Sequence, residues 1–89
     1  MTVILKLNKK IHKKDYKITK IIKFFAAGIH SYIHFIDDAG KDLQFNFDVY
    51  CSIEVDGIKH DYIEYRNNPA KFTAMIENIQ NIFALEALP

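Results

Sequence analysis

The clearest pattern along the chain is an alternation of apolar and polar residues between Leu43 and Val55. Apolar side chains fill every second position there, at Leu43, Phe45, Phe47, Val49, Cys51, Ile53 and Val55. A strand with one face on a hydrophobic core produces such a pattern. Because this segment exceeds the common strand length, we expect it to bend or to pair with different neighbours at its two ends.

Shorter segments on either side also have strand character. The alternation at Thr2–Leu7 predicts a short strand, and Ile29–Ile36 predicts another that ends in a turn over residues 37–40. Asp56-Gly57 is typical of a two-residue hairpin. It predicts that Ile58–Tyr65 returns antiparallel to the long strand, with Lys59 opposite Glu54.

Tyr16–Ala27 carries signals for two structures. Isoleucine and phenylalanine residues recur at helical spacing in this segment, and Asp15 is a suitable N-cap at the positive end of a helix. Gly28 would then end the helix in a left-handed conformation. The richness in Ile and Phe also suits a strand. We favour the helix.

The C-terminal segment has the features of an amphipathic helix. Asn68 is the expected N-cap, and Pro69 stands at the first helical position, which proline favours. We expect the helix to reach about Leu88 and to lie across the apolar face of the sheet. Its apolar stripe comprises Phe72, Met75, Ile76, Ile79, Ile82 and Phe83, and its water-facing residues are Thr73, Asn78, Gln80 and Asn81.

Together these elements predict one α+β domain over residues 1–89. The expected fold is a small antiparallel meander of about four strands, with an N-terminal helix and a C-terminal amphipathic helix on one face, in the order β-α-β-β-β-α. A chain of this length supports one domain with a modest core. Part of its apolar surface could therefore be completed by a partner or by a second copy in a homodimer.

The composition indicates a cytoplasmic protein. Cys51 is the only cysteine, so no disulfide can form within the chain, which fits a reducing compartment. The apolar stretch at residues 3–5 is too short for the core of a signal peptide, and no run approaches the ~18 apolar residues of a membrane span. We therefore expect no membrane association.

Charge is divided unevenly along the chain. Residues 1–25 contain eight lysines and one aspartate, a balance of +7, whereas residues 26–89 have a balance of −6. The basic part comprises Lys9, Lys10, Lys13, Lys14, Lys17, Lys20 and Lys23 in the predicted loop and helix, with Lys6 before them. This region predicts sequence-independent nucleic-acid binding as one alternative. With Arg66 as the sole arginine, bidentate reading of bases is not expected.

The even-numbered face of the long strand is polar and acidic. It carries Asp48 and Tyr50, and Tyr65 is expected on the same outer surface. Tyrosine is favoured in binding surfaces because it adds contact area at low entropic cost. Our leading hypothesis is a non-enzymatic inhibitor or regulator that binds and occludes another macromolecule, most plausibly a protein, through this face or the lysine region.

Candidate chemistry is sparse. His30 and His34 share one face, and with His60 they suggest a metal-dependent enzyme as a second alternative. A regular strand model, however, puts His30 and Glu64 roughly 10 Å apart across an intervening strand, too far for one ion. Cys51 lies on the core face, where a thiol is inert. We therefore expect no cofactor, no metal ligand and no catalytic residue.

Overall fold

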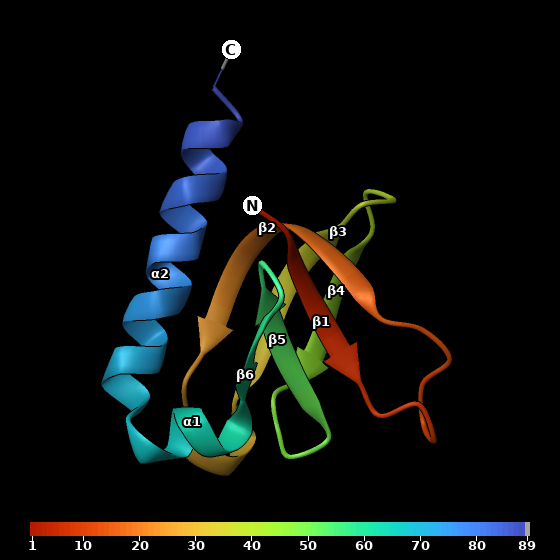
Figure 1. The fold of residues 1–89 in the computed structure, drawn as a ribbon, viewed down its shortest axis with the longest axis vertical. Coiled ribbons are helices and arrows are strands. Elements are labelled where there is room, and N and C mark those ends of the chain that lie inside the picture. Colours follow the sequence, from red (N-terminus) through yellow and green to blue (C-terminus); the bar gives the residue numbers. More distant parts are fainter. Residues whose placement is uncertain (89) are drawn as a thin grey trace.

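The computed structural model describes residues 1–88 and contains one six-stranded antiparallel sheet followed by two helices (Figure 1). The elements are β1 (Val3–Leu7), β2 (Tyr16–Phe25), a 3₁₀ turn (Gly28–His30), β3 (Tyr32–Asp37), β4 (Asp42–Asn46), β5 (Cys51–Val55), β6 (Ile58–Asp61), α1 (Tyr62–Asn67) and α2 (Pro69–Glu86). The α+β class is confirmed. The predicted four strands and N-terminal helix are wrong.

The sheet has the strand order β4-β3-β2-β1-β5-β6 and is strongly curled. In a flat sheet, β4 and β5 would lie about 19 Å apart, four strand spacings of roughly 4.8 Å. Yet the Cys51 thiol at the start of β5 donates a hydrogen bond to the carbonyl of Asn46 at the end of β4, over 3.5 Å. The sheet therefore rolls around its inner face and brings these strand ends together.

The long alternating segment consequently forms two strands. β4 pairs with β3, whereas β5 pairs with β1 and β6, so the expected change of neighbours is confirmed. A turn at residues 47–50 separates the two strands, and Phe47 within it is completely buried. Val49 departs from the alternation because it lies in this turn with 67% of its surface exposed.

The predicted helix at Tyr16–Ala27 is strand β2. Its pairing with β3 slips by one residue at Thr19 and again at Ile22, as expected for β-bulges. Each bulge adds one residue to the two-residue repeat of a strand, so inward side chains recur every third position, at Ile18, Ile21 and Phe24. This spacing resembles that of a helix, and it explains why the periodicity was misleading.

Side-chain hydrogen bonds connect both bulges of β2 to neighbouring elements. The Thr19 hydroxyl lies 3.1 Å from each of the carbonyls of Ile36 and Asp37 on β3. At the second bulge, the Gln80 side-chain amide of α2 donates to the carbonyl of Ile21 over 3.2 Å. Gln80 was expected to face water, but it is half-buried and ties α2 to β2. The irregular course of β2 is thus supported by specific hydrogen bonds.

Replacing Gln80 with alanine is expected to lower the free energy of unfolding by about 1–2 kcal/mol, because the partly buried carbonyl of Ile21 loses its partner. Chemical denaturation would measure the loss. Asn78→Ala is the matched control, since Asn78 is exposed on the same helix and should change stability by less than about 0.5 kcal/mol. Equal effects of the two substitutions would contradict the proposed role of Gln80.

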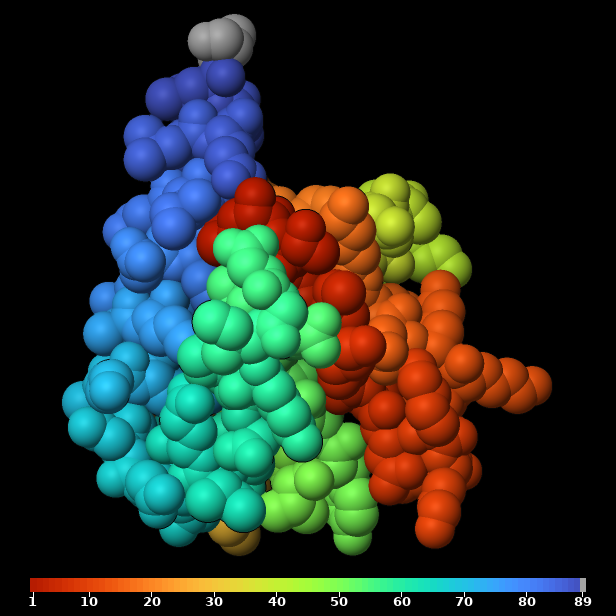
Figure 2. All heavy atoms as spheres, viewed as in Figure 1, coloured from red at the N-terminus to blue at the C-terminus, as the bar shows by residue number. Residues whose placement is uncertain are grey.

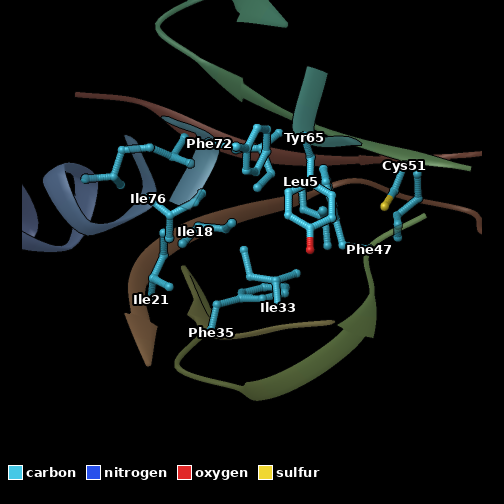
Figure 3. Close-up of a cluster of buried hydrophobic side chains, with 14 residues drawn as sticks. Leu5, Ile18, Ile21, Ile33, Phe35, Phe47, Cys51, Tyr65, Phe72 and Ile76 are labelled. Atoms are coloured by element: carbon cyan, nitrogen blue, oxygen red, sulfur yellow. The ribbon is translucent and has the colours of Figure 1, made fainter. Parts of the chain in front are cut away.

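The hydrophobic core lies between the curled sheet and the two helices. Figure 3 shows Leu5, Ile18, Ile33 and Phe35 of the sheet gathered with side chains of α1 and α2. The helix α2 packs against β2 and α1, and it contributes the buried residues Phe72, Ile76 and Ile79 to this core. Both helices thereby occupy the inner side of the sheet, with α2 along the left in Figure 1.

Several local predictions are confirmed. Asp56 and Gly57 have φ of 49° and 85°, as a tight hairpin turn requires, and Lys59 pairs with Glu54. Asn68 caps α2 by accepting from the Lys71 N–H, with Pro69 following it, and α2 ends at Glu86, two residues before the expected end at about Leu88. The predicted strand at Ile58–Tyr65 is shorter, because the Asp61 side chain caps α1 there.

Candidate functional site

The outer face of β2 carries a row of exposed lysines. Inward residues recur at every third position along this strand. A lysine directly precedes each of them, at Lys17, Lys20 and Lys23. In the described chain, none of their three ammonium groups forms a salt bridge. The bulges therefore place three cationic groups on one strand, facing away from the helices.

The bulges also shorten the distance between these lysines. Lys20 lies opposite Ile36 and Lys23 opposite His34, while the Lys17 carbonyl accepts from the N–H of Asp38. Neighbouring lysines therefore correspond to positions two residues apart on β3, a separation of roughly 7 Å at the usual strand rise. A regular strand would have sent alternate members of a three-residue repeat to opposite faces.

The loop between β1 and β2 holds the other predicted lysines, and Asp15 at its end pairs with Lys9 of the loop and with Lys6 of β1. Asp15 was predicted to cap a helix, but its carboxylate accepts from the Leu7 N–H and binds the Lys9 ammonium at 2.6 Å. Partial burial raises the pKa of Asp15, but hydrogen bonds from Lys9, Leu7 and Lys6 outweigh it and lower this pKa below its usual value. The carboxylate thus stays ionised and offsets nearby positive charge.

The remaining loop lysines differ from the β2 row in their setting. The Lys14 ammonium lies 4.8 Å from the centroid of the Tyr16 ring, a cation–π contact. Lys10 and Lys13 are exposed on the loop. Figure 2 shows this segment, coloured red to orange, projecting from the right side of the molecule. The structure therefore separates the predicted basic region into a loop and an ordered row on the sheet.

Two aromatic residues missed by the sequence analysis adjoin the lysine row. Phe25 and Tyr32 are opposite one another on β2 and β3, with stacked rings whose centroids are 5.1 Å apart. Phe25 retains 39% of its surface exposed. Within the segment predicted as a helix, Phe25 appeared to be one more core residue, so only the strand assignment identifies it as outward-facing.

The residues predicted for the acidic face do not form one surface. Tyr65 is buried in the core, where its hydroxyl shares a 3.0 Å hydrogen bond with Ser31, so its predicted role in partner binding is not compatible with the structure (Figure 3). Asp48 and Tyr50 lie in the turn between β4 and β5. The Asp48 carboxylate accepts from the Tyr50 N–H, and Tyr50 is 58% exposed.

Tyr50 borders a groove between this turn and the beginning of α1. The groove has a volume of about 310 Å³ and is lined by the exposed residues Val49, Tyr50 and Ile63, with Lys6 and Lys59 among its other lining residues. It contains both apolar and basic side chains. It is a second candidate contact surface, separate from the Phe25–Tyr32 pair.

The three histidines proposed as metal ligands have separate surroundings. His34 contacts Asp42 and pairs across strands with Gln44. His60 binds the Glu64 carboxylate at 2.8 Å, and His30 lies exposed in the 3₁₀ turn. Within residues 1–88, no group of three potential ligands is arranged to hold a metal ion.

Cys51 is 8% exposed at the start of β5. Burial raises the pKa of its thiol to about 11; a hydrogen bond with the Asp48 backbone partly opposes this rise, and the Asp48 charge adds a smaller increase. The neutral thiol donates to the backbone of Asn46. Because a thiolate is the reactive form, this environment suppresses nucleophilic chemistry.

In the folded protein, Cys51 is therefore expected to resist alkylation near neutral pH, whereas the unfolded chain reacts fully. Folding raises this pKa from its ordinary value of 9.0 to about 11, so the folded state favours the neutral thiol. The contribution of the neutral thiol to the free energy of unfolding is therefore complete below about pH 9 and decreases as pH rises towards 11. Mass spectrometry after alkylation, with and without denaturant, measures the reactivity. Rapid reaction of the folded protein would contradict the assignment.

No helix within residues 1–88 combines the length and apolar character needed to cross a membrane. The fold and surface define a small α+β protein whose sheet has an outer face with a lysine row. No protein-family model matches the chain, and the searches found no similar curated protein or solved structure.

Proposed function

We propose that the protein binds nucleic acid, with successive phosphates of one strand contacting Lys17, Lys20 and Lys23. The observation that carries the proposal is the row itself: three exposed lysines without carboxylate partners among residues 1–88, spaced at roughly 7 Å along the sheet. A repeated cationic group at this distance suits a repeated anionic group such as the phosphodiester backbone. The exposed lysines of the preceding loop extend the positive potential.

The expected binding is largely independent of sequence. Lysine supplies a compact charge without the planar double hydrogen bond that arginine offers to guanine or phosphate. Arg66, the sole arginine, donates instead to the Tyr62 hydroxyl at 3.0 Å. Recognition would thus rest on the phosphate backbone, which positions a nucleic acid without reading its bases.

A salt titration tests this function. Fluorescence anisotropy with a labelled oligonucleotide should show affinity that falls linearly on a double-logarithmic plot, with a slope of about −2 if three phosphates of a single strand are neutralised. Absence of binding at low salt, or affinity insensitive to salt, would overturn the proposal. Charge-reversed variants provide the second test and are considered in the Discussion.

Binding of a protein partner is a second candidate function, favoured by the groove beside Tyr50. Ile63 is 64% exposed there, with Val49 and Tyr50 exposed beside it. A large apolar side chain exposed in a groove offers contact area to a partner. Affinity capture with the wild type and Ile63→Asp would test it. A partner recovered by both proteins, or by neither, would argue against this surface.

A further inference from the structure

The outer face contains a compact group of four side chains at the end of the lysine row. Lys23 and Phe25 are neighbours on one face of β2, and they pair with His34 and Tyr32 on β3, respectively. The rings of Phe25 and Tyr32 are stacked, with 21° between their planes. A flat aromatic surface that spans β2 and β3 therefore lies next to a cationic group of β2 on the same face of the sheet.

Lys23 connects the aromatic pair to the phosphate row. Its ammonium lies 5.2 Å from the centroid of the Phe25 ring, a cation–π distance. A phosphate that binds this ammonium must come close to the same ring. The nucleoside attached to that phosphate is then within reach of the Phe25–Tyr32 pair.

We propose that Phe25 and Tyr32 form a base-stacking subsite that makes the protein selective for single-stranded nucleic acid. This inference rests on the proposed function. In a single strand, a base can leave its neighbours and present its π-face to an aromatic side chain. In a duplex, the same faces are covered by adjacent base pairs, so only the phosphates can interact with the lysine row.

The subsite is expected to tolerate any base, because every base has a π-face and stacking reads no hydrogen-bonding pattern. Base-independent stacking agrees with the composition of the row, which consists of lysines and contains no arginine that could read bases. The partial exposure of Phe25, at 39%, leaves ring surface for a ligand without requiring the core to open. Phe24, by contrast, packs inward against Phe47 and Phe72 and is not part of the subsite.

The test compares a labelled oligothymidine strand with a duplex of equal length at fixed low salt. The wild type is expected to bind the single strand at least about tenfold more tightly. A Phe25→Leu/Tyr32→Leu variant keeps apolar side chains but removes both rings. It should lose the preference for the single strand, while its affinity for the duplex and the salt dependence of that binding remain those of the wild type.

Tyr50→Leu provides the matched control, since it removes an exposed tyrosine from the turn between β4 and β5. It should retain the wild-type preference. Thermal melting would show that each variant is folded. Equal binding of strand and duplex by the wild type, or an unchanged preference in the double leucine variant, would overturn the subsite but leave the phosphate contacts standing. Failure of both nucleic acids to bind would overturn the proposed function and this inference together.

Discussion

Reversing the charge of Lys20 and Lys23 with glutamate is expected to weaken nucleic-acid binding by about 30-fold or more at low salt. Each substitution removes one attraction to phosphate and introduces one repulsion, and each such interaction between water-exposed charges contributes about 0.5 kcal/mol, which gives about 2 kcal/mol for the two substitutions. These two lysines are chosen because they lie at the centre and aromatic end of the row.

The chain provides a matched control for this variant. Lys41 and Lys71 are exposed and form no salt bridge in the described chain, and neither belongs to the outer face of β2 or to the basic loop. Lys41→Glu/Lys71→Glu changes the net charge by the same four units. If binding depends on the row, this control should retain affinity within about threefold, because neither lysine belongs to the row that contacts the phosphates and an exposed charge outside a direct contact contributes little.

Fluorescence anisotropy at low salt measures both variants, and the plot against salt concentration separates two explanations. Loss of the row should make the slope less steep, because fewer counterions are released on binding. Comparable losses in the row variant and the control would show that only net charge matters. In that case the ordered spacing on β2 would carry no function.

Phe47→Ala is expected to have the largest effect on stability. Phe47 is completely buried in the turn between β4 and β5, and its ring contacts those of Phe24, Tyr65 and Phe72 at centroid distances of 5.6, 6.1 and 5.3 Å. Truncating a buried phenylalanine costs about 3–5 kcal/mol. A domain of this length has a stability of roughly 4–13 kcal/mol, so the variant would lose a large part of it.

Differential scanning calorimetry or thermal circular dichroism measures this loss. The melting temperature should fall by at least about 12 °C, given roughly 4–8 °C per kcal/mol for a domain of this size. Phe25→Ala is the control, because it removes the same ring from the outer face and should cost no more than about 1 kcal/mol. A similar fall in both variants would show that the turn at Phe47 does not anchor the core.

The reason for the large effect lies in the topology. The turn at residues 47–50 joins two strands that are four positions apart in the sheet, and the Phe47 N–H donates to the Ser31 carbonyl over 2.9 Å. Ser31 is itself buried and shares a hydrogen bond with Tyr65 of α1. Phe47 therefore links the curled sheet to the helices at one place.

The candidate site was only partly predictable from the sequence. The lysines were identified, but their arrangement was not, because the spacing of three favoured a helix and concealed the strand. Phe25 and Tyr32 gave no signal of their own: the first sat in the supposed helix, and the second in a strand whose neighbours were unknown. Tyr65 was expected outside, yet the helix α1 turns it into the core.

The sequence by itself determined the features that depend on neighbouring residues. The alternation of β1, β4 and β5, the Asp56-Gly57 hairpin and the Asn68-Pro69 helix start all follow from local conformational preferences and from the need to bury one face. Burial of Cys51 follows from the same alternation.

Only the tertiary structure decided how β2 runs and what its outer face presents. Bulges at Thr19 and Ile22 accompany the curling of the sheet around its core, and their hydrogen bonds reach residues distant in sequence. Thr19 contacts the carbonyls of Ile36 and Asp37, and Gln80 of α2 donates to the Ile21 carbonyl. In a strand, inward side chains recur every two residues, and one added bulge residue makes this repeat three residues long. One face of a helix shows a similar three-residue spacing. The local pattern could not distinguish them, whereas pairing with β1 and β3 could, and this pairing placed Lys17, Lys20 and Lys23 in one row.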